Sequence, residues 1–512
     1  VSIIFINPLR EAPIDDDWAY VLTVKNYVDT GHYVLHPWAA ANFPFQVVWG
    51  SVFSKIIGFS YSSLRISTLV LTFFGMVGLY LFARELKINR NVSGLLALLL
   101  IACPLFLKFS LSFMTDIPFL SLFVLSAFLY WRAFSRDSLY YAFAASLICA
   151  AATFTRQLGI SLLGSVILYG LVYFRQKVNI KFVILGLTLP CMALVWQIQA
   201  AFFNPNWGME MVKEAQRLYF ANYQGVFVNL LIRPAYILIY LSLFCLPFIF
   251  VLIRYIRNKL NFKVLFLVSA YVIISLLVGK LIWNTTFTFP YIPWAFGDVV
   301  PWDPLLLKVI VTFCLLFAAI LFGASILPVS QRIKKDFYSG GGTVFVFLIF
   351  GSLLIYTLLF YKLGDEYLLI FVPFILLLFG YSFQTYLKNK RLFLLIFCSA
   401  IVSIAISTVR VKNDLVHGEV YWKSCETLRI SGIPIKDISC NWMWISYYSY
   451  QAYIDETIGV KHSNLNDFFK RWLPERELST QYIVTSTPQL VKGKTTVISA
   501  EPYGIYILKR EK

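Results

Sequence analysis

Long uninterrupted runs of apolar residues constrain the fold of this chain more than any other feature. The segments LVLTFFGMVGLYLFA at 69–83 and VFVFLIFGSLLIYTLLFY at 344–361 contain no charged residue, and a helix of about 20 apolar residues crosses a bilayer. The whole chain is 59% hydrophobic and only 14% charged, whereas a soluble domain is about a quarter charged. Transmembrane β-strands would instead alternate apolar and polar residues over about 10 positions. The sequence therefore predicts a polytopic α-helical membrane protein.

The apolar runs predict about thirteen transmembrane helices. The chain starts with VSIIFINP, which we interpret as the outer end of a first helix that begins before the given sequence; no cleavable signal peptide is visible. Short connections near Ser112 and Arg156 predict helical hairpins. Complete spans are predicted at 64–84, 92–110, 115–133, 138–155, 158–174, 181–203, 231–253, 263–283, 305–327, 343–362, 366–387 and 391–409.

Basic residues gather in alternate loops, and this pattern predicts the orientation in the membrane. Basic residues near span ends mark the cytoplasmic side. The basic loops hold Arg84, Lys87 and Arg90; Arg132 and Arg136; Arg175, Lys177 and Lys181; Arg254, Arg257, Lys259 and Lys263; Arg332, Lys334 and Lys335; and Lys388, Lys390 and Arg391. The other short loops hold few basic residues: Lys108, Arg156, Lys280 and Lys362. The net charge of +18 is thus explained by topology, and no basic stripe for nucleic acid is present.

This orientation places the first outer loop (10–63), the loops at 204–230 and 284–304 and the tail on the extracytoplasmic side. Residues 1–409 are predicted to form the transmembrane domain. Residues 410–512 are predicted to form a soluble α/β domain, because QYIVTS and TTVISAEPYGIYILK alternate like strands. The helical spacing of WAYVLTVKNYV and FPFQVVWGSVFSKIIG predicts two interfacial helices in the first outer loop.

Ionisable residues at the outer ends of the spans are the candidate functional groups. An ionisable side chain at membrane depth is costly and usually functional. Distant segments place such groups at the same face, where we expect them to line one cavity. They are Asp15, Asp16 and Asp17 in IDDDWAY, Asp116 in FMTDIPF, Arg156 in FTRQLG, and Asp365 and Glu366 in KLGDEYLL.

Each candidate also has a structural interpretation. Adjacent carboxylates raise one another's pKa, which suits a general base, but neighbouring helical side chains point about 100° apart. Asp15 or Asp16 could equally be a helix N-cap. Asp116 precedes Pro118 and could begin a helix. Arg156 fits a phosphate or an interfacial anchor.

Three other features leave alternatives open. His32 and His36 are close in sequence, as in a divalent metal site, but the sequence offers no clear third ligand, so the presence of a metal ion there stays open. The aromatic loop at 284–304 suits a lipid or sugar site, or an interfacial belt. Cys425 and Cys440 in the tail can pair or remain free.

The segments IDDDWAYVLTVKNYVDTGHYV, FPFQVVWGSVFSKIIGFSYSSLRI and MTDIPFLSLFVLSAFLYWRA, in this order, resemble landmarks of polyprenyl-phosphate-sugar-dependent class C glycosyltransferases. This family includes the dolichyl-phosphate-mannose protein mannosyltransferases and the bacterial aminoarabinose transferases that act on lipid A. The similarity covers roughly residues 10–160 and extends to the span number and outer C-terminal domain, so it implies the GT-C type of membrane fold.

The resemblance also implies roles for individual residues. The family's Asp-Glu pair falls on Asp16-Asp17 with Tyr20 in the aromatic position, so Asp16 is expected to deprotonate the acceptor. Asp116 is expected to be a second active-site acid, and Arg156 and Gln157 to face the lipid phosphate.

The chain departs from the family pattern at three places. Asp17 replaces the usual Glu, Asn42-Phe43-Pro44 replaces Lys-Pro-Pro, and Glu366-Tyr367 replaces a late Arg-Tyr. Glu366 and Tyr367 are nonetheless expected at the substrate, although Glu366 cannot supply the cationic donor contact of the family.

The resemblance predicts an integral-membrane glycosyltransferase that uses a polyprenyl-phosphate sugar donor. A hexosyl or pentosyl unit would pass to an extracytoplasmic protein, lipid or glycan in one inverting displacement with an aspartate base. The alternatives are a lipid or solute transporter, which would favour inverted repeats and charges near mid-membrane, and a non-catalytic scaffold or sensor.

Overall fold

The computed structural model describes residues 2–173, 180–203, 206–259, 262–283, 340–360, 365–441, 443–448, 480–486, 491, 495–501 and 504–510, with scattered residues of 317–338. The predicted loop at 284–304 and most of the predicted span at 305–327 lie outside these residues.

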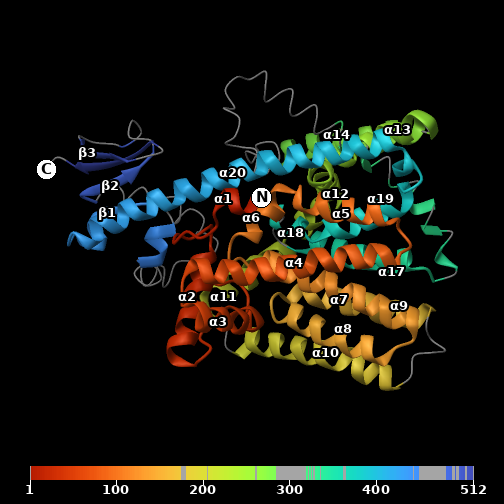
Figure 1. Cartoon of the computed structure of the whole chain (residues 1–512), viewed down its shortest axis with the longest axis horizontal. Helices are drawn as coiled ribbons and strands as arrows, with labels where there is room; N and C mark the ends of the chain where they lie inside the picture. The colour runs from red at the N-terminus through yellow and green to blue at the C-terminus, as the bar shows by residue number, and fades with distance from the viewer. Residues whose placement is uncertain are drawn as a thin grey trace.

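Helices form most of the described chain as far as residue 430 (Figure 1). Their bounds are α1 (Ser2–Ile6), α2 (Asp17–Thr30), α3 (Pro44–Ile57), α4 (Tyr61–Glu85), α5 (Arg90–Ile101), α6 (Pro104–Ser110), α7 (Asp116–Arg136), α8 (Leu139–Thr153), η1 (Gln157–Gly159), α9 (Ile160–Tyr173), α10 (Ile180–Phe203), α11 (Trp207–Ala221), α12 (Tyr223–Phe244), η2 (Leu246–Phe248), α13 (Ile249–Lys259), α14 (Phe262–Trp283), α17 (Gly342–Leu359), α18 (Asp365–Leu368), α19 (Phe371–Phe383), η3 (Tyr386–Lys388), α20 (Lys390–Ile430) and η4 (Ile435–Asp437).

Within the described residues, six helices are long and apolar enough to cross a membrane, or up to seven if the bent pair α5–α6 is one span. Along the chain, shorter apolar helices, α8 and α19 among them, lie between these spans. The structure therefore confirms a polytopic α-helical membrane protein, and the number of about thirteen spans stays a prediction.

The predicted span at 92–110 is not one straight helix. It divides into α5 and α6, which are bent by 71° at the break. Proline cannot donate a backbone hydrogen bond and disfavours helical geometry at the residue before it, so Pro104 begins a new helix. The hydroxyl of Ser403 donates to the carbonyl oxygen of Ala102 at 2.8 Å and thereby satisfies a carbonyl at the break.

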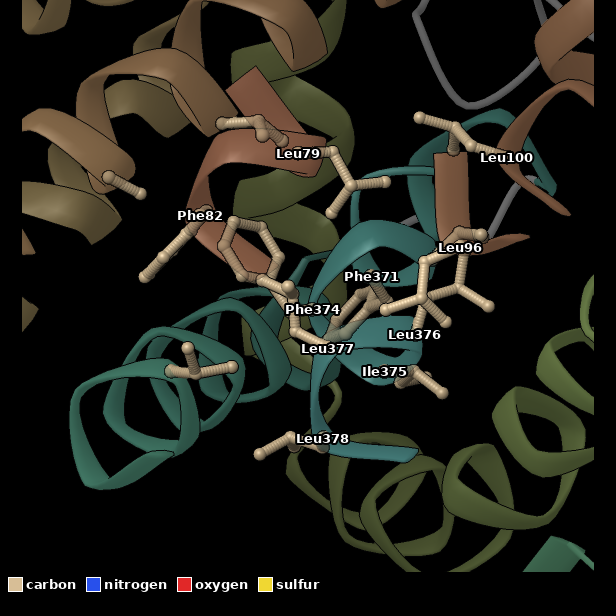
Figure 2. Packing of buried hydrophobic residues seen from close by; sticks show 14 of the residues in the cluster. Leu79, Phe82, Leu96, Leu100, Phe371, Phe374, Ile375, Leu376, Leu377 and Leu378 are labelled. Carbon is tan, nitrogen blue, oxygen red and sulfur yellow. The ribbon is translucent and has the colours of Figure 1, made fainter. Parts of the chain in front are cut away.

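The short helix α19 occupies the centre of the main hydrophobic cluster. Nearly all of its side chains are buried, as expected for a helix that is apolar all round. Figure 2 shows its Phe371 and Phe374–Leu378 side chains among residues of α4 and α5, including Leu79, Phe82, Leu96 and Leu100. The predicted span at 366–387 is thus divided into α18 and the buried α19.

The last predicted span, 391–409, is much longer in the structure. Its helix, α20, continues for 41 residues to Ile430. No proline interrupts this stretch, and Gly432, with φ of 90°, leaves the helical path just after it. The predicted domain boundary at 409/410 therefore falls inside α20. Figure 1 shows this helix running from the helical bundle to the C-terminal sheet.

The C-terminal sheet confirms the predicted strands. It contains β1 (Ile438–Ser439), β2 (Tyr482–Thr485), β3 (Thr495–Glu501) and β4 (Ile505–Arg510) in the order β1-β2-β4-β3. Strands β3 and β4 pair antiparallel. A disulfide joins Cys425 of α20 to Cys440 after β1, which decides the question that the sequence left open.

Helices α4 and α7 approach closely because glycine lies at their contact. A Cβ atom on Gly75 would lie 2.5 Å from the Oγ of Ser121 and 2.8 Å from its Cα. One turn further on, a Cβ on Gly78 would lie 3.3 Å from the Cα of Leu125. Small residues allow membrane helices to pack backbone against backbone.

We therefore expect the substitution Gly75→Ala to lower stability by about 1–3 kcal/mol, since the added methyl group overpacks the contact of α4 with α7. Thermal unfolding of the purified protein in detergent measures this change. The matched control is Gly94→Ala in α5, where an added Cβ meets no atom within 4 Å. Equal unfolding midpoints for the two variants would contradict the prediction.

Candidate active site

The segment that leads into α2 is held by a buried arginine. Arg65, in the second turn of α4, is 0% exposed. Its guanidinium donates to the carbonyl oxygens of Pro8 at 3.1 Å, of Arg10 at 2.6 Å and of Ala12. Glu11, in the same segment, accepts hydrogen bonds from the first backbone amides of α4 at 2.9 and 3.1 Å. This segment is therefore fixed to the start of α4.

The consecutive aspartates that follow this segment point to different partners. Asp15, with φ of 51°, forms an ion pair of 2.8 Å with the Nζ of Lys108 in α6. Asp17 is 0% exposed and accepts backbone hydrogen bonds from Ile14 at 2.8 Å and from Phe113 at 3.3 Å. Asp15 and Asp17 therefore tie the start of α2 to the connection between α6 and α7.

Asp16, in contrast, lines a cavity of about 190 Å³. It precedes α2 as the N-cap residue, and Tyr20, one turn further, lines the same cavity. The rest of the described wall comes from two other segments: Trp38 and Ala40 after α2, and Gly208, Met211 and Val212 in α11. Figure 1 shows α2, α3 and α11 at the end of the bundle that lies nearer the sheet.

Arg156 links the start of α7 to the end of α8. Its Nη1 lies 2.9 Å from the Oδ1 of Asp116, which is 3% exposed. Its Nε donates to the hydroxyl of Thr115 at 2.7 Å, and its guanidinium lies 5.7 Å from the ring centroid of Tyr367 in α18. The hairpin arginine is thus held in place by α7 and α18.

Tyr20 connects the cavity with this arginine. Burial raises the pKa of its phenol, Arg156 lowers that pKa, and Asp16, Asp116 and Glu366 raise it further. Charges act on one another strongly only at short range in the presence of salt. The four charged groups therefore lie near Tyr20.

The structure brings together most of the residues that the sequence singles out: Asp16, Tyr20, Asp116, Arg156, Glu366 and Tyr367. Gln157 is half-buried and begins η1 beside Arg156. Asp17 does not line the cavity; it is buried against Ile14 and Phe113. The opposite end of the bundle has a basic cluster, in which Arg132 and Arg136 contact Glu85 at 3.2 and 3.1 Å.

Sequence reasoning missed several residues that build the site. Arg65 lies in the segment FPFQVVWGSVFSKIIGFSYSSLRI that carries the family resemblance, but periodicity does not reveal its backbone partners. Lys108 appears only as one of few basic residues on the outer side, although it pairs with Asp15. The contribution of α11 has no signal beyond an amphipathic pattern.

His32 and His36 do not form a metal centre with a third ligand in the described part of the chain, where no group of three or more His, Cys, Asp or Glu residues is placed to hold a metal ion. Burial lowers the pKa of His36 to about 4. Its neutral ring accepts a hydrogen bond at Nδ1 from the backbone amide of Trp38 at 3.2 Å. His36 thus orders the loop that carries Trp38.

The buried carboxyl group of Asp17 leads to a prediction about pH. Burial raises its pKa to about 7, although Arg65 and the two backbone amides lower it. The unfolded carboxyl has a pKa near 4, so the folded protein binds an extra proton between about pH 4 and pH 7. Stability from this group must therefore fall as pH rises through this window, by up to about 1.4 kcal/mol per pH unit.

We expect the difference in unfolding midpoint between wild type and Asp17→Asn to decrease from pH 5 to pH 7 and to level off above pH 8. Thermal unfolding at a series of pH values measures it. A difference that is constant across this range would show that Asp17 is ionised throughout.

Comparisons with known proteins show what this chain is similar to. Residues 44–198 match the family model described as dolichyl-phosphate-mannose-protein mannosyltransferase. This range includes Asp116 and Arg156 and excludes Asp16. No curated protein matches the chain.

Three solved structures illustrate the structural likeness. ArnT from Cupriavidus metallidurans in the apo state has a TM-score of 0.47 at 15% identity, over 99% of this chain and 95% of that chain. ArnT bound to undecaprenyl phosphate gives 0.45 at 13% identity, over 99% and 96%. The oligosaccharyltransferase AglB from Archaeoglobus fulgidus, in complex with an inhibitory peptide and a dolichol-phosphate, gives 0.49 at 13% identity, over 93% and 66%.

The family-model match thus confirms, over residues 44–198, that the chain is similar to the polyprenyl-phosphate-dependent glycosyltransferases of the dolichyl-phosphate-mannose-protein mannosyltransferase type.

Proposed function

We propose that this protein is an integral-membrane glycosyltransferase that moves a sugar from a polyprenyl-phosphate donor to an extracytoplasmic acceptor. One observation carries the proposal: Asp16 and Tyr20 line one cavity, and Arg156, held by Asp116 and Thr115, lies near Tyr20. A transfer from a phosphate leaving group requires a base for the acceptor and positive charge for the departing phosphate. Asp16 and Arg156 meet those requirements within one site.

The proposed reaction is a single displacement. Asp16 takes the proton of the acceptor hydroxyl, and the hydroxyl oxygen forms a bond to the anomeric carbon of the sugar. The bond from this carbon to the phosphate oxygen breaks, and its electron pair stays on the phosphate. Arg156, with Gln157 beside it, stabilises that phosphate. Because one displacement occurs, the anomeric configuration inverts.

The remaining candidates would support this step. Asp116 holds Arg156 at 2.9 Å and is proposed to orient the sugar or the acceptor. Tyr367 packs against the same guanidinium, and Glu366 adds a carboxylate near Tyr20 that can accept hydrogen bonds from sugar hydroxyls. The proposed role of Asp17 is to position Asp16, since its carboxylate accepts hydrogen bonds from the backbone amides of Ile14 and Phe113.

We propose that this site faces the extracytoplasmic side. The basic loops, which mark the cytoplasmic side, include Arg132 and Arg136 at the end of α7 opposite Asp116. The disulfide between Cys425 and Cys440 lies beyond the membrane part of α20. Disulfides form mainly outside the cytoplasm, which agrees with an outward-facing sheet.

The function is tested with purified protein in lipid and a set of synthetic radiolabelled polyprenyl-phosphate sugars carrying hexosyl or pentosyl units. We expect wild type to consume a donor, and Asp16→Asn to lose about 10²–10⁴-fold in turnover while donor binding persists, because a general base contributes about that much. The matched control, Asp29→Asn, changes an exposed carboxylate of α2 that pairs with Lys25 and keeps activity.

Full activity in Asp16→Asn would move the base to another carboxylate. Donor binding without consumption by wild type, with protein, lipid and glycan acceptors all supplied, would instead favour a transporter. The same assay after chelation, with and without added Mg²⁺ or Mn²⁺, tests the divalent metal that the sequence leaves possible.

A second prediction concerns Arg156. We expect Arg156→Gln to weaken donor binding about 10- to 150-fold, as the loss of a charge-assisted hydrogen bond of about 1.5–3 kcal/mol implies. Arg156→Lys retains the charge but loses the hydrogen bond from Nε to Thr115, so its donor affinity should be intermediate. Donor binding isotherms measure both, and Arg217→Gln, on the exposed face of α11, is the control. Unchanged donor affinity in Arg156→Gln would contradict the phosphate contact.

A further inference from the structure

We infer that Glu419 of α20 is a positioning residue for the proposed reaction: through Arg10, it holds the segment that leads to Asp16. This inference rests on the proposed function, in which Asp16 is the base. An ion pair, an apolar cluster and a disulfide support it.

Arg10 is held from two sides. Its backbone carbonyl oxygen accepts a hydrogen bond from the guanidinium of Arg65 in α4 at 2.6 Å. Its own guanidinium forms an ion pair with the carboxylate of Glu419, between Nη1 and Oε2. Arg65 therefore fixes the backbone at this position from α4, whereas Glu419 fixes the side chain from α20. Asp16 follows only six residues later.

This ion pair is sheltered from solvent. The side chains of Arg10 and Glu419 are 18% and 15% exposed, and the two residues lie 409 positions apart in the chain. Ion pairs between exposed side chains contribute little, because water and salt screen them. Removing one partner of a largely buried pair instead leaves the other charge uncompensated. We therefore expect Arg10 to leave its place, and the segment with it, when Glu419 is lost.

An apolar cluster fastens α20 to the same segment. Ala12 and Trp18 flank the aspartates and are buried in one cluster with Trp422 of α20. The ring centroid of Trp18 also lies 6.1 Å from that of Trp38, which lines the cavity. The contacts of α20 thus reach both sides of Asp16 and extend to the cavity wall.

The C-terminal sheet fixes the part of α20 that carries Glu419. Six residues further along the helix, the buried Cys425 forms the disulfide with Cys440 after β1. The hydroxyl of Tyr421 donates to the carbonyl oxygen of Val484 in β2 at 2.8 Å. Figure 1 shows this end of α20 beside the sheet. Glu419 is thus carried by a helix that the sheet holds in place, which gives the sheet an indirect part in the reaction.

Turnover and donor binding are measured on the purified protein in lipid, with a labelled polyprenyl-phosphate sugar and with protein, lipid and glycan acceptors supplied. We expect Glu419→Ala to lower kcat about 10- to 100-fold, because a misplacement of about 1 Å can cost about 10²-fold. Donor Kd should stay unchanged, since the contacts of Arg156 with Asp116 and Thr115 come from the start of α7. The matched control is Lys423→Gln, which removes a second ion-pair partner of Glu419, a side chain 68% exposed, and should keep kcat.

Two double variants show whether Glu419 acts through Arg10 and Asp16. Arg10→Met should lower kcat about as much as Glu419→Ala, and the two together should lower it no further, because both remove the same contact. In an Asp16→Asn protein, Glu419→Ala should have little additional effect on kcat, since the base that Glu419 positions is already absent. Effects that multiply in either double variant would overturn the inference, as would full kcat in Glu419→Ala.

Hydrogen exchange separates positioning from a general loss of stability. In Glu419→Ala, we expect the backbone amides of residues 9–17 to exchange faster than in wild type, while those of α7 keep their rates. Faster exchange throughout the protein would show a general destabilisation and would overturn the positioning role.

The outcome for the proposed function can be distinguished from the outcome for this inference. If Asp16→Asn loses turnover but Glu419→Ala keeps it, the proposed function stands and this inference fails. If wild type neither binds nor consumes any polyprenyl-phosphate sugar, the proposed function fails and this inference fails with it.

Discussion

The buried guanidinium of Arg65 is the interaction on which the site depends. A charged group removed from water is costly unless it is paired and hydrogen-bonded. Arg65 meets this condition with the carbonyl oxygens of Pro8, Arg10 and Ala12 and with the nearby carboxyl of Asp17. An otherwise irregular segment is thereby fixed to the start of α4, so Asp16 reaches the cavity at a defined position. A neutral residue at position 65 would leave these carbonyl oxygens without their buried donor.

The same arrangement explains why distant segments meet. Helix α6 contributes Lys108 and its connection to α7 contributes Phe113, which bind Asp15 and Asp17, while the start of α7 contributes Asp116. The end of α8 adds Arg156, and α18 adds Tyr367. Each group lies at a helix end, where charged side chains avoid the apolar interior of the membrane. The cost of burying charge therefore concentrates the chemistry at one end of the bundle.

Helix positions could largely be predicted, because apolar runs are local features, but interruptions depend on contacts. The break at Pro104 has a sequence signal, yet the carbonyl of Ala102 also needs Ser403, far along the chain, as its partner. The continuation of α20 past residue 409 could not be predicted, since its polar second half gains buried contacts near the sheet. Similarly, α19 reads as an ordinary span, although it is a short helix surrounded by protein.

For the site, the sequence by itself determined which residue types stand at the helix ends predicted to face outward: the three aspartates, Asp116, Arg156, and the Glu366-Tyr367 pair. This much follows from the spacing of apolar runs and from the cost of placing charge within them. Only the tertiary structure decided which aspartate faces the cavity, because Arg65, Lys108 and Phe113 engage the neighbours of Asp16 from elsewhere in the chain. It also decided that α11 closes the cavity wall, since hydrogen bonds between segments about 170 residues apart hold it there, and local patterns carry no record of such contacts.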